Sequence, residues 1–216
     1  MSRRSQGQAD TVIVLDFETS GLSPDQGDRA IEIGAVRIEN GRITGRFQQL
    51  MNPGRRINPF IENYTGITNA MLRNAPACRE VMAEFSEFIG DFDLVAHNAS
   101  FDRRFLEAEL QQIQQGYTGE FACSMLASRR IYPDAPSHKL GTLVEYKCLP
   151  TSGTFHRALA DAEMTTHLWL RMLEDITDRH CIENIPFSLM QELSRVPKAA
   201  AAGYLQRWRG EQAGTL

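Results

Sequence analysis

The sequence lacks any uninterrupted run of about 20 apolar residues, the length that a helix needs to cross a lipid bilayer. The arginine pair within residues 1–8 has no apolar segment after it of the kind that a secretory signal requires. We therefore expect a cytoplasmic protein without a membrane partner. A length of 216 residues is enough for one well-buried domain and too short for two.

Cysteine is scarce, and positive charge does not exceed negative charge. The cysteines are Cys78, Cys123, Cys148 and Cys181. Their wide spacing lacks the close pairs of a zinc knuckle or a redox motif, so we expect reduced thiols. The formal net charge of −4 argues against a protein that coats nucleic acid, because coating requires a basic surface. Binding of one strand end stays possible. Candidates for phosphate contacts, of which we expect one or two to be used, are Arg103, Arg104, Arg129, Arg130, Lys139 and Arg157.

Two acidic residues stand at the end of a run that otherwise predicts a buried strand. The valine, isoleucine and leucine residues between Thr11 and Glu18 are typical of a strand that is buried on both faces. Side chains two positions apart on a strand point the same way, so Asp16 and Glu18 share a face. Carboxylates held together away from water repel each other unless a cation binds or one is protonated, and a divalent metal is the simplest remedy. The alternative is a strand that ends at Leu15, with both acids solvated in a loop.

A third acidic residue follows a second short apolar run. The run from Phe92 to His97 precedes a stretch, Asn98 to Gln115, in which apolar residues recur at helical spacing. Asp102 therefore falls in the first turn of a helix that follows a strand. The helix dipole favours an acid there in any case, so this position alone is more typical of a capping charge than of a metal ligand.

A histidine and an aspartate stand five residues apart at the start of another predicted helix. If both were helical, His156 and Asp161 would lie roughly 140° apart around the axis and could not share a face. They converge only if His156 lies in the preceding loop and Asp161 in the first or second helical turn. Gly153 and Thr154 favour such a loop. The alternative is the polar start of an ordinary amphipathic helix.

Together, these three segments resemble the exonuclease motifs of the DnaQ-like superfamily. The segments are Asp16-Phe-Glu18-Thr-Ser-Gly21, His97-Asn-Ala-Ser-Phe-Asp102 and His156-Arg-Ala-Leu-Ala-Asp161. A histidine five residues before the last aspartate is typical of the DEDDh branch. The resemblance covers about residues 11 to 175 and includes Ile31-Glu-Ile-Gly-Ala-Val36 and Tyr64-Thr-Gly-Ile67. Three concordant motifs are a far more specific signal than one.

The resemblance implies a 3'→5' exonuclease that uses two divalent ions, Mg²⁺ or Mn²⁺, and releases nucleoside 5'-monophosphates from nucleic acid 3' ends. The implied metal ligands are Asp16, Glu18, Asp102 and Asp161, and the implied general base is His156. The residue types suit this chemistry. Paired metals activate water and stabilise the leaving oxygen, and hard oxygen ligands suit Mg²⁺ and Mn²⁺. A histidine with a pKa near neutrality can remove the proton of the attacking water.

The position of residues in the family motifs also implies substrate contacts. These residues are Thr19, Leu22, Tyr64, Thr65 and Phe101. Tyr64 could stack on a base, while a buried structural tyrosine is equally consistent with the sequence.

Three functions remain open. The leading one is a proofreading or repair exonuclease for single-stranded DNA, with a DNA polymerase as a candidate partner. The others are an RNA-trimming exoribonuclease and an inactive scaffold subunit. The sequence does not predict an oligomeric state.

The order of elements predicts an α/β fold. Strands are expected at 11–18, 30–38 and 43–51, and the tight turn at Asn40-Gly41 makes the last two antiparallel. An irregular stretch to residue 75, with a short helix near 68–73, precedes a helix from Pro76 to Gly90 and then alternating strands and helices. This order gives the ribonuclease H-like mixed five-stranded sheet flanked by helices that the family resemblance implies. We divide the chain into an exonuclease domain at 11–175 and a helical extension at 176–216 that packs on the same domain.

Overall fold

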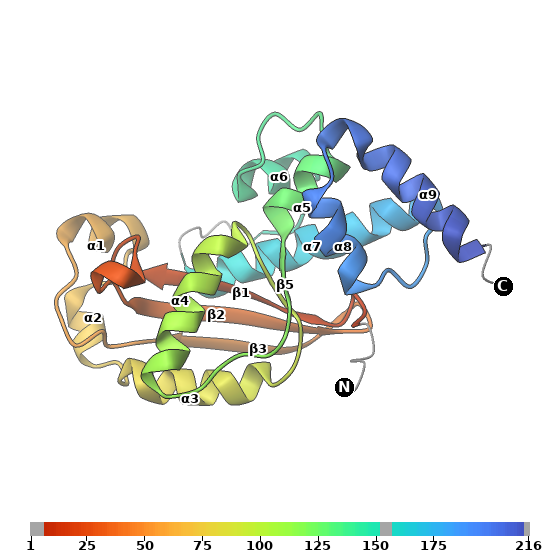
Figure 1. Ribbon diagram of the computed structural model, residues 1–216. Helices are drawn as coiled ribbons and strands as arrows, with labels where there is room; N and C mark the ends of the chain where they lie inside the picture. The colour runs from red at the N-terminus through yellow and green to blue at the C-terminus, as the bar shows by residue number, and fades with distance from the viewer. Residues whose placement is uncertain (1–6, 152–156, 214–216) are drawn as a thin grey trace.

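A computed structural model describes residues 7–151 and 157–213. Its centre is one sheet with the strand order β3-β2-β1-β4-β5 (Figure 1). The strands are β1 Val12–Thr19, β2 Ala30–Glu39, β3 Arg42–Leu50, β4 Leu94–Ala96 and β5 Phe121–Cys123. β1, β2 and β3 pair antiparallel, whereas β4 pairs parallel with both β1 and β5. The predicted mixed five-stranded sheet is thus confirmed.

Helices follow the strands and cover the sheet. They are α1 Pro59–Thr65, α2 Asn69–Arg73, α3 Cys78–Ile89, α4 Ala99–Gln112, α5 Ser124–Ile131, α6 Leu140–Tyr146, α7 Ala158–His180, α8 Phe187–Arg195 and α9 Ala201–Ala213. Two short 3-10 helices, η1 Pro24–Gln26 and η2 Lys198–Ala200, complete the described elements.

Helix α1 occupies a stretch that we predicted to be irregular, and that prediction was wrong. Asn58 caps this helix, because its Oδ1 atom accepts a hydrogen bond of 2.6 Å from the backbone nitrogen of Phe60. Pro59 suits the first helical position, and Gly66 ends the helix with a φ of 71°. Seven residues are too few to show a helical period, so only the capping residues carried the signal.

The alternation of side chains along β1 divides the core into two layers. Val12 and Val14 pack in one apolar cluster with Trp169 of α7. Ile13, Leu15 and Phe17 point to the opposite face and pack in a second cluster with Phe85 of α3 and Phe105 of α4. Helices α3 and α4 therefore cover one face of the sheet, and α7 covers the other (Figure 1).

The C-terminal helices share the core of the α7 face. Leu189 and Leu193 of α8 are fully buried in the same cluster as Trp169. Helix α7 continues across residue 175 to His180. The division of the chain at residue 175 stays a prediction.

The structure bears on two features expected from composition, the state of the cysteines and the absence of a membrane-spanning helix among the described residues. The four cysteines have free thiols, as their spacing predicts. In the ranges 7–151 and 157–213, no helix is long and apolar enough to cross a membrane.

Candidate active site

Three carboxylates converge at the end of β1. Asp16, Glu18 and Asp161 each offer one oxygen atom, and these atoms all lie within 4.8 Å of one another. The strand continues through Thr19, and Glu18 is only 9% exposed. The alternative of two solvated loop residues after Leu15 is therefore wrong.

Strand periodicity and helix position explain this convergence. Val12 and Val14 point toward α7, and side chains two and four positions farther along the strand point the same way. Asp16 and Glu18 thus project from β1 on the side of α7. Asp161 lies in the first turn of that helix, as the sequence predicts.

A glycine in β2 allows α7 to approach the sheet closely. Gly34 pairs in register with Asp16. A Cβ atom at Gly34 would lie 2.1 Å from the backbone nitrogen of Leu159 and 2.2 Å from the carbonyl carbon of Ala158. Both distances are far shorter than van der Waals contact, so any side chain here would displace the turn that carries Asp161.

The buried residue Glu32 anchors the same turn of α7. Its carboxylate accepts hydrogen bonds from Arg157 at 2.7 and 3.1 Å and from the backbone nitrogen of Ala158 at 3.1 Å. Gln48 donates a further hydrogen bond of 3.0 Å. These partners satisfy the hydrogen-bonding capacity of a carboxylate that has 0% exposure.

Our sequence analysis missed the role of Glu32. The available signal was an acidic residue within the apolar run of the second strand. Arg157, which we expected as a candidate for phosphate contact, uses its guanidinium group in the ion pair with Glu32.

Asp102 approaches the acidic cluster from α4, on the other face of the sheet. It lies in the first helical turn and is 2% exposed. Its Oδ1 atom accepts a hydrogen bond of 3.2 Å from the backbone nitrogen of Phe17. This burial against β1 distinguishes Asp102 from a solvated charge at a helix start.

Burial and mutual repulsion disfavour the charged forms of these acids. Burial, followed by the charges of Asp102 and Asp161, raises the pKa of Asp16 well above its usual range. Burial and then the charge of Asp161 raise the pKa of Glu18 to about 8. Burial raises the pKa of Asp102 to about 7, although the backbone N–H of Phe17 opposes this change. Negative charge is therefore in excess among these acids, and a divalent cation would compensate it.

The donor set fits a hard cation. Asp16, Glu18 and Asp161 offer carboxylate oxygen, without sulfur or imidazole among the described members of the cluster. Mg²⁺ and Mn²⁺ prefer such ligands, whereas structural zinc sites are built from cysteine and histidine. The ligand role of each carboxylate stays a prediction.

Of the two motif histidines, His97 lies within the described residues and His156 does not. His156 lies outside the described residues, and its role as a base stays a prediction. His97 has a structural environment, with its ring nitrogens 2.9 Å from Ser124 Oγ and 3.0 Å from the His138 carbonyl oxygen. Burial lowers the pKa of His97 to about 4, so its imidazole is neutral at physiological pH.

The five residues predicted to contact substrate fall into two groups. Leu22 and Tyr64 are 78% and 52% exposed, which excludes the alternative of a buried tyrosine. Thr19 and Thr65 are buried, and their hydroxyl groups donate to the Gly21 and Ile61 carbonyl oxygens. Phe101 is half-buried beside Phe105, with 5.0 Å between ring centroids.

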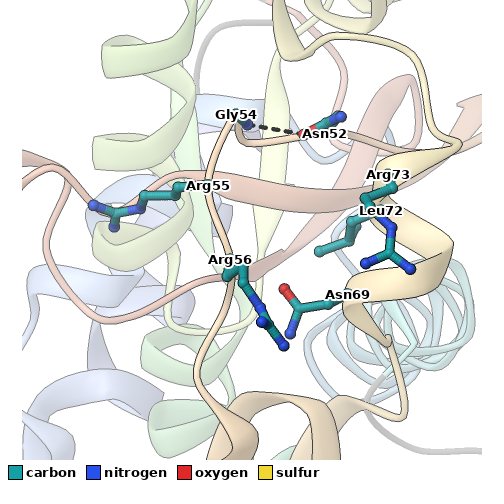
Figure 2. A pocket seen from close by; sticks show the side chains of 7 residues that line it. All are labelled: Asn52, Gly54, Arg55, Arg56, Asn69, Leu72 and Arg73. Carbon is teal, nitrogen blue, oxygen red and sulfur yellow. Dashed lines mark hydrogen bonds between the residues drawn. The ribbon is translucent and has the colours of Figure 1, made fainter.

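A basic pocket with a volume of about 290 Å³ lies between α2 and the segment that precedes α1 (Figure 2). It is lined by Asn52, Gly54, Arg55, Arg56, Asn69, Leu72 and Arg73. Our sequence analysis assigned no role to these three arginines. Arg73 is far from the other two in sequence, so no motif indicated that they would meet.

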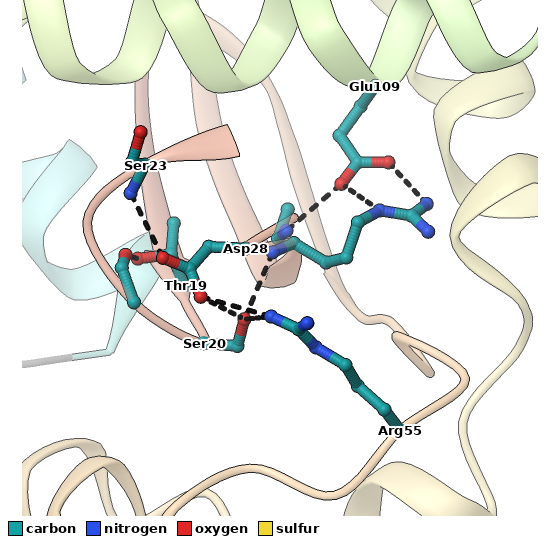
Figure 3. A network of polar contacts seen from close by, with 9 residues as sticks. Thr19, Ser20, Ser23, Asp28, Arg55 and Glu109 are labelled. Carbon is teal, nitrogen blue, oxygen red and sulfur yellow. Dashed lines mark hydrogen bonds and ion pairs between the residues drawn. The ribbon is translucent and has the colours of Figure 1, made fainter. Parts of the chain in front are cut away.

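Polar contacts connect this pocket to the loop that follows β1 (Figure 3). Asp28 accepts hydrogen bonds from the backbone nitrogen of Ser23 at 3.1 Å and from Arg55 Nη2 at 3.0 Å. Arg29 forms a bidentate ion pair with the buried Glu109, at 2.8 and 2.7 Å. These contacts hold the loop that carries Leu22 in a defined conformation.

The chain is similar to known exonucleases and DNA polymerases in sequence and to nucleases in structure. The family model of the RNase_T exonucleases matches residues 13–169. Among curated sequences, the PolC-type DNA polymerase III of Halalkalibacterium halodurans is 40% identical over 168 residues, which are 77% of this chain and 12% of the polymerase. The corresponding enzyme of Bacillus subtilis is 36% identical over 174 residues, which are 80% of this chain and 12% of the polymerase. The chain thus spans a small part of these relatives.

Solved structures with the same fold include nucleases bound to nucleic acid or a nucleotide. Exonuclease X in complex with 5' overhanging duplex DNA aligns with a TM-score of 0.66 at 27% identity, over 85% of this chain and 99% of that one. The nuclease domain of 3'hExo, a DEDDh family member bound to rAMP, aligns with a TM-score of 0.65 at 21% identity, over 77% of this chain and 92% of that one.

Proposed function

This chain belongs to the RNase_T exonuclease family, and we propose that it is a 3'→5' exonuclease that removes nucleotides from the 3' end of single-stranded DNA with the help of two divalent cations. The observation that carries this proposal is the convergence of Asp16, Glu18 and Asp161 within 4.8 Å, with Asp102 buried alongside. This proposal favours an enzyme over the inactive scaffold that the sequence alone left open.

The four carboxylates are proposed to hold the cations. Glu32 and Gly34 support this role, because they bring the first turn of α7 to the end of β1. Two divalent cations bound there would lower the pKa of the attacking water and stabilise charge on the leaving 3' oxygen.

His156 is proposed to take a proton from the attacking water while the oxygen of that water forms a bond to phosphorus. The bond between phosphorus and the 3' oxygen then breaks, and that oxygen receives a proton. The products are a nucleoside 5'-monophosphate and a strand shortened by one nucleotide with a free 3' hydroxyl group. His156 suits this role because a histidine can exchange protons near neutral pH.

Leu22, Tyr64 and Phe101 are proposed to contact the terminal nucleotide, together with Thr19 and Thr65. Leu22 and Tyr64 support this role through their exposure, and Tyr64 lies within electrostatic reach of Glu18 and Asp161. Tyr64 offers an aromatic face to a base, a contact worth about 1–3 kcal/mol in single-strand binding. The buried threonines would act by holding the backbone of the two loops.

DNA is preferred over RNA as the proposed substrate because the relatives with 36–40% identity are DNA polymerases. On the same ground, we propose a DNA polymerase as a partner, a role in proofreading or repair, and the cytoplasm as the location. An RNA-trimming activity is the competing outcome.

Matched 5'-labelled DNA and RNA oligonucleotides test the substrate. We expect a descending ladder from single-stranded DNA and slower loss of the RNA. A circular single strand should resist while its linear form is degraded. Faster loss of the RNA would replace the DNA proposal, and cutting of the circle would contradict an exonuclease.

A further inference from the structure

We propose that the basic pocket binds a phosphate group of the substrate strand, upstream of the bond that is cleaved. This inference rests on the proposed exonuclease function and extends the substrate site beyond the terminal nucleotide. The pocket is formed by Arg55, Arg56 and Arg73 around Asn69 (Figure 2).

The pocket presents positive charge that the protein does not neutralise. Within the described part of the chain, the side chains of Arg56 and Arg73 form no hydrogen bond or ion pair, and both residues are exposed. Figure 2 shows their side chains on either side of Asn69. Arg73 ends α2, where the helix dipole favours a cation, but Arg56 lies in a loop and has no such partner. Two unneutralised guanidinium groups in one pocket of a chain with net charge −4 favour an anionic ligand.

The floor of the pocket is held by hydrogen bonds. Asn69 is 9% exposed, and its side chain accepts from the backbone nitrogen of Ile57 at 2.8 Å and donates to the Ile57 carbonyl oxygen at 3.0 Å. Asn52 Oδ1 accepts from the backbone nitrogen of Gly54 at 2.9 Å, in a turn where Gly54 has a φ of +73°. A ligand can therefore bind without ordering this backbone, which would lower the entropic cost of binding.

The third arginine, Arg55, connects the pocket to the loop that follows β1. Arg55 Nη2 lies 3.0 Å from Asp28 Oδ1 and 3.3 Å from Ser20 Oγ. Ser20 directly follows the last residue of β1, the strand that carries Asp16 and Glu18. Arg55 thus connects the pocket to the loop that directly follows the strand of the acidic cluster (Figure 3).

Exposed aromatic side chains lie on the helix beside the pocket. Phe60 and Tyr64 of α1 are 68% and 52% exposed, and their rings are stacked with 6.0 Å between centroids and 10° between planes. Burial and then the charges of Glu18 and Asp161 raise the pKa of Tyr64, so its phenol lies within electrostatic reach of the cluster. Aromatic faces next to a cationic groove are the combination by which proteins bind single strands. This combination favours a strand phosphodiester over a free phosphate as the occupant.

The test compares the double variant Arg56→Ala/Arg73→Ala with a variant of equal charge, Arg42→Ala/Arg195→Ala. Arg42 on β3 and Arg195 on α8 are exposed and lie outside the pocket. Single-stranded DNA of increasing length is one substrate. The p-nitrophenyl ester of thymidine 5'-monophosphate, which has no upstream strand, is the other. A third variant, Arg56→Lys/Arg73→Lys, keeps the charge.

For long strands, we expect the alanine variant to raise KM roughly tenfold, the factor that corresponds to about 1.4 kcal/mol, with kcat unchanged. The lysine variant should restore KM to near the native value, and all proteins should cleave the p-nitrophenyl ester alike. Strand binding in EDTA, measured by fluorescence anisotropy, should show a weaker salt dependence in the alanine variant. The log–log slope should fall by roughly 0.7 for each phosphate that the variant no longer neutralises.

Equal KM values and equal salt slopes for the native protein and the alanine variant would overturn the proposal. Thermal stabilisation of the native protein alone by inorganic phosphate, without a change in strand KM, would assign the pocket to a free anion and also overturn it. If the native protein cleaves neither substrate, the proposed function fails, while the anisotropy measurement still decides whether the pocket binds a strand.

Discussion

Replacement of Gly34 by alanine should disable the site through packing alone, without changing any predicted ligand. The added Cβ would lie 2.1 Å from the backbone nitrogen of Leu159. Ordinary contact begins at about 3.4 Å, so α7 and β2 must separate by more than about 1 Å. The obstacle is backbone, which cannot rotate away as a flexible side chain can.

The expected cost to activity follows from this displacement. Asp161 lies in the displaced turn, and a misplacement of about 1 Å can lower a catalytic rate roughly 100-fold. Overpacking of this kind typically costs about 1–3 kcal/mol of unfolding free energy. We therefore expect Gly34→Ala to fold with a lowered melting temperature and to lose roughly 99% of its exonuclease rate.

Gly45→Ala is the matched control. Gly45 also lies within a strand, but a Cβ there would meet Phe88 at 3.5 Å and Arg37 at 3.6 Å, which is ordinary contact. The rate at which Gly45→Ala degrades a labelled oligonucleotide should stay close to the native rate. A folded Gly34→Ala protein with native kcat would refute the argument that close packing of α7 positions Asp161.

Three further predictions concern the acidic cluster and His156. Replacement of any one of the four carboxylates by alanine should abolish turnover. The melting temperature of the metal-free protein should hold or rise, because a repulsive charge is removed. Loss of folding or near-native turnover would contradict this prediction. Because burial raises the pKa of Glu18 from 4.5 to about 8, the folded metal-free protein binds more protons than the unfolded chain between these values. The contribution of Glu18 to the free energy of unfolding should therefore be fully present below pH about 4.5 and fall as the pH rises toward about 8, and Glu18→Gln should flatten this trend in denaturant titrations with EDTA. His156→Ala should lower kcat roughly 10²–10⁴-fold and leave Mn²⁺ binding nearly intact, whereas a native rate would show that His156 is not the base.

The sequence predicted the elements with strong local signals. Apolar runs and the turn at Asn40-Gly41 located β1, β2, β3 and β4, and helical spacing located α3, α4 and α7. The shared face of Asp16 and Glu18 and the position of Asp161 at a helix start also follow from such local patterns, whereas the meeting of the three carboxylates was implied only by the family resemblance. Helix α1 was missed since its only signals were the cap at Asn58 and the glycine at its end.

Features that depend on contacts between distant segments were not predictable in this way. The ion pair of Glu32 with Arg157 joins residues 125 positions apart. The requirement for glycine at position 34 exists only because α7 packs against it. The basic pocket likewise brings Arg56 and Arg73 together through the folding of the segment around α1. Patterns along one sequence do not reveal which of these distant residues come into contact in the fold.

Titration of the metal-free protein with Mn²⁺ tests the central claim most directly, with isothermal calorimetry reporting stoichiometry and a labelled strand reporting cleavage in parallel. The four carboxylates predict saturable binding that approaches two ions per chain in the presence of a nucleoside 5'-monophosphate, cleavage that rises with occupancy, and loss of both in Asp16→Asn. Cleavage that persists in EDTA, or Mn²⁺ binding that Asp16→Asn leaves unchanged, would contradict the account.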